Sequence, residues 1–182
     1  MIRVGSVIII NVYLPCSETS DRLSIIDDVL QEAWSWRLKY PDCSVVIGGD
    51  LNTDLDKRNN ASCCINNFIN NHSLVRGDAN FSHKRRQTYL NESFGHSSVI
   101  DYFICDTGDD IVDYYVLESE INISNHLPVV MNTFAKLALT LTNTKIPVCN
   151  LFIKTDTNIM SVIHFSTNIN LMPRILRLQL PR

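Results

Sequence analysis

Apolar residues follow two different spacings over the first 134 positions of the chain. Residues 6 to 14 are almost continuously apolar up to Pro15, which predicts a buried strand. Beyond Ser20 and Asp21, either of which can cap a helix, apolar residues recur at three and four positions until just before Pro41. This spacing predicts a helix lying on a sheet, with these residues facing inward: Leu23, Ile26, Val29, Leu30, Ala33, Trp34 and Leu38.

Short strands and one more helix are expected from there to residue 134. Residues 44 to 48 predict an apolar strand that delivers Gly49 and Asp50 to a turn. A polar loop then leads to a second helix, whose expected inward residues are Ile65, Phe68, Ile69 and Leu74. Further strands are expected to start near residue 87 and to cover residues 98 to 105, 112 to 118 and 128 to 134. This order predicts a layered α/β sandwich.

Residues 135 to 182 have a different character. They are rich in Thr, Asn and Ile, contain no glycine, and show strand-like spacing only around Leu151–Ile153 and over residues 171 to 180. We therefore expect one domain over residues 1–134 and an unassigned tail over residues 135–182. The tail could be a linker, an added terminal element, or sequence read past the end of the original domain.

Composition excludes some classes of protein. With 45% hydrophobic and 19% charged residues among 182, the chain suits one globular domain, and it has no apolar stretch long enough to predict a membrane span. The apolar run Val7–Ile10 lacks the features of a signal peptide, and the six cysteines show no metal-binding spacing. We therefore expect an intracellular protein with reduced thiols, not secreted, that could be nuclear.

The net charge of -3 conceals a gradient. Residues 1 to 134 hold ten of the 16 basic residues and 18 of the 19 acidic ones, a balance of -8, whereas residues 135 to 182 hold six and one, a balance of +5. An acidic body is compatible with nucleic-acid chemistry if its carboxylates gather a divalent cation. The charge distribution could equally have no bearing on what the protein binds.

Chemically capable side chains follow the strand predicted at residues 44 to 48. Asp50 and Asn52 are two positions apart, so in extended backbone both would point toward one site. A carboxylate there can take a proton from water, and an amide can hold that water or a phosphate oxygen. Gly-Asp-Leu-Asn is also typical of an ordinary turn.

Asp101 interrupts the otherwise apolar run around Val99–Ile104, and a buried carboxylate needs a partner. His126, in Ser124–Pro128 before another apolar run, is the candidate. Such a pair can orient an imidazole and stabilise its cation, or it can be a structural hydrogen bond. We expect Asp50, Asn52, Asp101 and His126 to converge on one rim of the sandwich.

Four motifs, in this order, resemble the second half of the endonuclease/exonuclease/phosphatase superfamily: Asn11–Pro15, Gly48–Asn52, Ser97–Ile104 and Ser124–Pro128. The likeness is strongest to the endonuclease domain of non-LTR retrotransposons and covers about residues 5 to 134. It implies a partial four-layered α/β sandwich of the deoxyribonuclease type. It also implies that the chain is related to reverse-transcriptase-associated endonucleases.

The resemblance further implies metal-dependent phosphodiester hydrolysis with Mg²⁺ or Mn²⁺. Asp50 would activate water, Asn52 and Tyr13 would position water and phosphate, and His126, held by Asp101, would stabilise the developing charge. As a lone strand residue, Tyr13 could equally be a half-buried packing residue. The expected partner is nucleic acid, with DNA as the first candidate, and no contact with a membrane is expected.

The chain departs from the family pattern in two ways. The residue before the histidine is usually an aspartate near the metal; here it is Asn125, which offers a neutral oxygen ligand. The family's metal-binding glutamate lies in a first half of the fold, upstream of Asn11–Pro15, and Glu18 and Glu32 do not match it. The resemblance therefore implies a missing first half, an incomplete cation site, and an uncovered strand at Val7–Ile10.

Other readings stay open. The basic cluster around Lys84, Arg85 and Arg86 could follow a nucleic-acid backbone, or it could be a solvated hairpin tip. The chain could be a catalytically silent remnant that binds nucleic acid or another protein. A third reading keeps the superfamily but changes the substrate to a phospholipid or inositol phosphate. The short segment before Asp101, without an added substrate loop, is less typical of that group.

Overall fold

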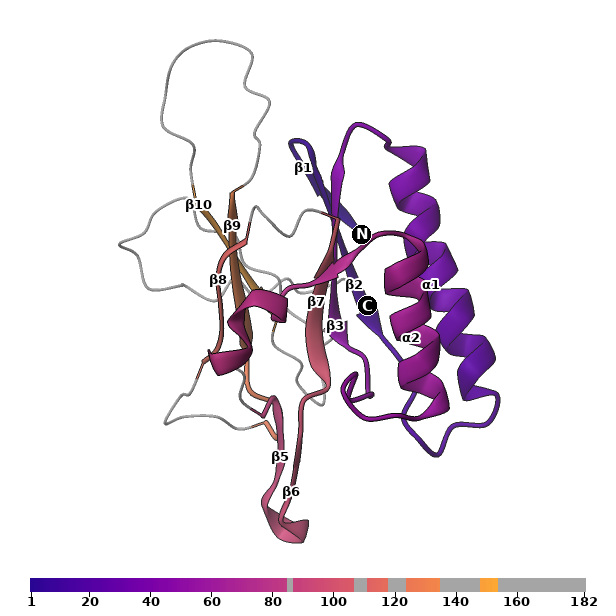
Figure 1. The fold of residues 1–182 in the computed structure, drawn as a ribbon, viewed down its shortest axis with the longest axis vertical. Helices are drawn as coiled ribbons and strands as arrows, with labels where there is room; N and C mark the ends of the chain where they lie inside the picture. Colours follow the sequence, from indigo (N-terminus) through magenta and orange to yellow (C-terminus); the bar gives the residue numbers. More distant parts are fainter. Residues whose placement is uncertain (85–86, 107–110, 118–123, 135–147, 154–182) are drawn as a thin grey trace, which may run out of the picture.

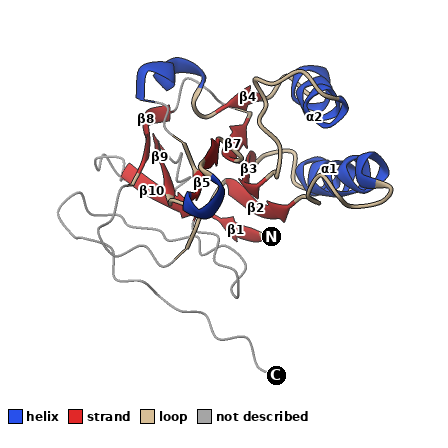
Figure 2. Ribbon diagram, turned by 90° about the horizontal axis from the view of Figure 1, so that it is seen from below, coloured by secondary structure: helices blue, strands red, loops and turns tan. Residues whose placement is uncertain are grey.

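The computed structural model describes residues 1–84, 87–106, 111–117, 124–134 and 148–153, which form three layers (Figures 1 and 2). One layer holds helices α1 (Arg22–Lys39) and α2 (Asn60–Asn71). The middle layer is a mixed sheet in the order β1 (Ile2–Val4), β2 (Val7–Tyr13), β3 (Ser44–Asp50), β7 (Asp101–Cys105) and β4 (Val75–Arg76). The third layer is an antiparallel sheet of β10 (Val148–Ile153), β9 (Val129–Phe134) and β8 (Ile111–Val116). The predicted α/β sandwich is confirmed.

The central sheet is buried on both faces, which explains its continuously apolar strands. Ile8 and Ile10 of β2 pack with Val45 and Ile47 of β3 in the core beneath the helices. Ile9, with Val46 and Phe103, packs in a second core against Val129 and Met131 of β9. The expectation that Val7–Ile10 lacks cover is wrong, because β9 closes the face that the helices leave open.

Helix α1 lies on the sheet through a narrower stripe than its sequence suggested. Ile26, Leu30 and Ala33 are buried, whereas Leu23 and Leu38 are exposed, so these two predicted inward positions are wrong. Residues spaced by four and three positions share one face of a helix, and Leu38 falls off that face. Leu23 lies on that side of the helix but in its first turn, where it stays exposed. Neither described helix is long and apolar enough to cross a membrane.

The β3 strand continues through Gly49 to Asp50, so these residues end a strand and are not in the predicted turn. Gly49 has φ +148°, and a Cβ there would lie 1.9 Å from the carbonyl oxygen of Val12. Only glycine therefore allows β2 and β3 to approach so closely. In the register, Tyr13 pairs with Asp50, and Asp50 pairs with Asp101. Paired residues share a sheet face, so these three form a row across β2, β3 and β7.

Several short elements differ from the sequence prediction, which expected a strand to start near residue 87 but no 3₁₀ segments. A hairpin of β5 (Tyr89–Asn91) and β6 (His96–Ser98), with the 3₁₀ turn η2 (Glu92–Phe94) at its tip, projects from the sandwich (Figure 1). The single strand expected over residues 98 to 105 is divided between β6 and β7. Another 3₁₀ segment, η1, covers Ala79–Lys84. Strand β10 pairs with β9 although it belongs to the predicted tail; the domain division itself stays a prediction.

Candidate active site

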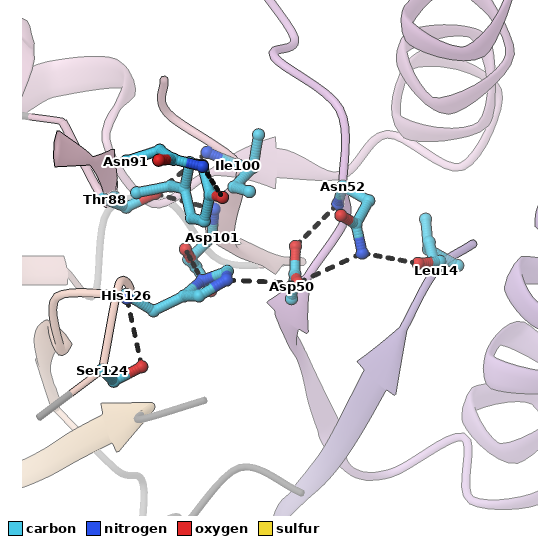
Figure 3. Close-up of polar contacts among 10 residues, drawn as sticks. Leu14, Asp50, Asn52, Thr88, Asn91, Ile100, Asp101, Ser124 and His126 are labelled. Atoms are coloured by element: carbon cyan, nitrogen blue, oxygen red, sulfur yellow. Dashed lines mark hydrogen bonds and ion pairs between the residues drawn. The ribbon is translucent and has the colours of Figure 1, made fainter. Parts of the chain in front are cut away.

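His126 lies between two buried carboxylates, one at the end of β3 and one at the start of β7 (Figure 3). Its Nδ1 is 3.0 Å from Asp101 Oδ2 and 3.3 Å from Oδ1. Its Nε2 is 3.9 Å from Asp50 Oδ2. The predicted Asp101–His126 contact is confirmed, and because a carboxylate only accepts hydrogen bonds, Nδ1 donates to Asp101.

Burial and charge shift the proton affinities of this group. Asp50 is only 2% exposed, and burial, reinforced by the neighbouring Asp101 charge, raises its pKa to about 6. The backbone N–H of Asn52 and the charge of His126 oppose this rise. For His126, burial disfavours the cation, but the hydrogen bond and charge of Asp101, together with the charge of Asp50, outweigh it and raise the pKa above 6.5. A basic carboxylate therefore lies beside an imidazole that favours its charged form.

Asn52 holds the Asp50 carboxylate from the opposite side (Figure 3). Its backbone N–H donates to Asp50 Oδ1 at 2.8 Å, and its Nδ2 donates to Asp50 Oδ2 at 3.1 Å and to the Leu14 carbonyl at 2.9 Å. The predicted proximity is correct, but the predicted reason is wrong. Asn52 is not extended; with φ +47° it curls back over Asp50. We call Asp50, Asn52, Asp101 and His126 the rim cluster.

Thr88, which was not predicted from the sequence, joins the backbone at Asp101 to the backbone next to His126. Its buried hydroxyl accepts from the backbone N–H groups of Ile100 at 2.9 Å and Asp101 at 3.1 Å. Its carbonyl accepts from Leu127 N, next to His126, at 2.7 Å. A lone threonine before a hairpin carries no sequence signal of such a role, because its partners are remote in the chain.

The hairpin strand β5 also fixes the loop that carries His126. Leu90 N donates to the Asn125 carbonyl at 2.8 Å, and the Tyr89 ring meets the His126 ring edge-on at 5.0 Å between centroids. The backbone N–H of His126 donates to Ser124 Oγ at 3.1 Å. The imidazole is thus positioned from its backbone, its ring face and its Nδ1.

The other predicted site residues are less closely tied to the rim cluster. Tyr13 shares the row with Asp50, but its side chain is 61% exposed, so it is not the half-buried packing residue considered above. Asn125 is exposed beside His126. Lys84 ends η1, and Arg85 and Arg86 lie outside the described residues, so the nucleic-acid contact of this basic cluster stays a prediction.

A divalent cation fits the donor set of the rim cluster. One ligand atom each from Asp50, Asp101 and His126 lie within 4.8 Å of one another. Carboxylate oxygens are the ligands that Mg²⁺ and Mn²⁺ prefer, whereas an imidazole in its charged form has no free lone pair for a metal, and the pKa of His126 is raised. Asp50 and Asp101 are therefore the residues that would hold the ion. The role of Asn125 as a metal ligand stays a prediction.

No protein-family model and no curated protein match this chain. Among solved structures, an endonuclease/exonuclease/phosphatase family protein from Leptotrichia buccalis C-1013-b superposes with a TM-score of 0.41 at 17% sequence identity. The superposition covers 64% of this chain and 43% of that protein, so the chain is similar to less than half of that structural neighbour.

Proposed function

We propose that the rim cluster hydrolyses phosphodiester bonds of nucleic acid with the help of a divalent cation, and that DNA is the first candidate substrate. The observation that carries this proposal is the placement of His126, with Nδ1 on Asp101 and Nε2 facing Asp50. The order of the four sequence motifs, which resembles retrotransposon endonuclease domains, supports the same reaction. On the same resemblance we propose that the protein is intracellular and acts on DNA.

Asp50 is the proposed general base. Its pKa of about 6 leaves it mostly ionised near neutral pH while making it a stronger proton acceptor than an ordinary carboxylate. The two donors from Asn52 fix the carboxylate plane, so the base is oriented before a substrate arrives. Water held at this carboxylate would lose its proton to Asp50 as its oxygen bonds to phosphorus. The bond from phosphorus to one sugar oxygen would break, and that leaving oxygen would take a proton from solvent.

His126 is the proposed stabiliser of the charge that builds on the phosphate oxygens. Asp101 fixes the ring and favours the imidazolium, which leaves Nε2–H as a donor. A fixed cation in a partly buried site stabilises a developing anion more strongly than water does. A divalent cation held by Asp50 and Asp101 would add polarisation of the phosphate oxygens, while lowering the pKa of Asp50 from its value in the metal-free site. Asn125, one residue away and neutral, would bind that cation less strongly than an aspartate.

A plasmid-nicking assay tests the proposal. Supercoiled plasmid is incubated with the chain in Mg²⁺, in Mn²⁺, and in EDTA, and the appearance of open-circular DNA is followed. Nicking in either metal that stops in EDTA supports the proposal. Binding of the plasmid without nicking under any metal condition contradicts it and favours a nucleic-acid binding module.

A further inference from the structure

Arg22 joins the two chain segments that frame Asp50. Its Nε donates to the Pro15 carbonyl at 3.0 Å, and its Nη2 donates to the Asn52 carbonyl and to Thr53 Oγ1, both at 2.7 Å. Pro15 follows the end of β2, and Asn52 and Thr53 follow the end of β3. One guanidinium therefore ties together two loops that are 37 positions apart in the chain.

Asn52 is held on both of its sides as a result. Its side chain binds the Leu14 carbonyl and Asp50, while Arg22 holds its backbone carbonyl. A left-handed backbone at φ +47° is uncommon for a residue other than glycine, although asparagine adopts it more readily than most. The Arg22 hydrogen bond holds the carbonyl in the orientation that this conformation gives it.

The position of Arg22 does not favour helix α1. It is the first helical residue, where the helix dipole disfavours a cation. Asp21 before it has φ +55° and makes no capping hydrogen bond through its side chain. The contacts of the guanidinium with the loops, rather than with the helix, account for an arginine here.

We infer that Arg22 is a positioning residue, which keeps Asn52, and through it the Asp50 carboxylate, in the geometry that the reaction needs. This inference rests on the proposed function for its catalytic consequence, but its structural part does not. Arg22 touches neither Asp50 nor His126; it acts through Asn52. Misplacement of a catalytic group by small distances can cost up to a hundredfold in rate.

Arg37 provides a matched control. It also lies on α1 and is partly buried, and it ties the helix to the opposite end of the sheet through Asp106 at 3.1 Å and the Pro41 carbonyl at 2.9 Å. Replacing either arginine removes one such tie, but only Arg22 contacts the Asn52 loop.

The experiment compares Arg22→Ala, Arg22→Lys and Arg37→Ala with the wild type in Mg²⁺-dependent nicking. We expect Arg22→Ala to lower kcat about tenfold to a hundredfold with little change in KM. Arg22→Lys should recover part of the rate, and Arg37→Ala should retain it even if its melting temperature falls as far. Equal rate losses in Arg22→Ala and Arg37→Ala overturn the inference, because a merely structural tie would produce them.

Nuclear magnetic resonance of the Asn52 side-chain amide separates this inference from the proposed function. We expect its two proton signals to move toward solvent-exposed values in Arg22→Ala and to stay in place in Arg37→Ala. If the wild type does not nick DNA but these signals move, the proposed function fails while the positioning holds. Unchanged Asn52 signals in Arg22→Ala contradict the positioning, whatever the activity.

Discussion

Replacing Asp50 with asparagine should stabilise the fold at pH 8, even though it removes the proposed base. Burial and the Asp101 charge raise the pKa of this carboxyl from 3.8 to about 6. The folded chain therefore binds the Asp50 proton more tightly than the unfolded chain does. The free energy of unfolding therefore falls as the pH rises from about 4 through 6, because ionisation of Asp50 costs more in the folded state than in the unfolded state.

The magnitude follows from that difference in proton affinity. A tenfold change in affinity corresponds to about 1.4 kcal/mol, so an ionised Asp50 costs the fold about 3 kcal/mol at pH 8. Asparagine carries no charge but replaces one oxygen that Asn52 Nδ2 contacts, which costs about 1 kcal/mol. The expected net gain is about 2 kcal/mol at pH 8. Most of it should disappear at pH 4.

Urea unfolding, followed by tryptophan fluorescence in EDTA at pH 8 and pH 4, measures the effect. Asp78→Asn is the matched control, because Asp78 is 1% exposed but paired with Arg76 through hydrogen bonds of 3.0 and 2.8 Å. Arg76 would keep its 2.8 Å ion pair with Asp56 but lose two charged hydrogen bonds, which should destabilise the fold by about 2 kcal/mol. If Asp50→Asn is less stable than the wild type at pH 8, burial does not strain the Asp50 carboxylate and the reasoning is refuted.

Three further substitutions test other parts of the structure. Thr88→Val leaves the N–H groups of Ile100 and Asp101 without an acceptor and should cost about 2 kcal/mol or more in urea unfolding, whereas Thr88→Ser keeps the hydroxyl; equal losses would contradict this role. Gly49→Ala should prevent stable folding as judged by circular dichroism, whereas Gly95→Ala, where a Cβ meets nothing within 4 Å, should fold; a folded Gly49→Ala would show that β2 and β3 can separate. Asn125→Asp should lower the Mg²⁺ concentration that supports half-maximal nicking, because it adds an anionic ligand, and an unchanged Mg²⁺ titration would remove Asn125 from the cation site.

The sequence predicted the site best where local pattern and chemistry coincide. A carboxylate within an apolar strand must find a buried partner, so the Asp101–His126 pair could be inferred although 25 positions separate the two residues. The continuously apolar strands β2 and β3, and the helices α1 and α2 with their three- and four-residue spacing, were also predicted from local pattern. The side chains at the edges of a periodic pattern were not, as the exposed Leu23 and Leu38 of α1 show.

What could not be predicted depends on contacts between remote segments. Asn52 is held by Leu14, just after β2, through its side chain and by Arg22, at the start of α1, through its backbone carbonyl, and no residue near Asn52 in the sequence signals its left-handed conformation. Thr88 gains its role only when the hairpin meets β7. Strand β4 has only two residues and is defined by its partner β7, and the strand-like spacing at Leu151–Ile153 indicated only the second half of β10.

The most direct test of the proposed active site is the single-turnover nicking rate of His126→Ala compared with that of His72→Ala. His72 is also packed against aromatic rings, with its ring centroid 4.2 Å from that of Trp34, but it lies at the end of α2, outside the rim cluster. We predict that His126→Ala loses metal-dependent nicking by about a hundredfold or more, while His72→Ala keeps the wild-type rate. Nicking that survives in His126→Ala at the wild-type rate would contradict the assignment of catalysis to the rim cluster.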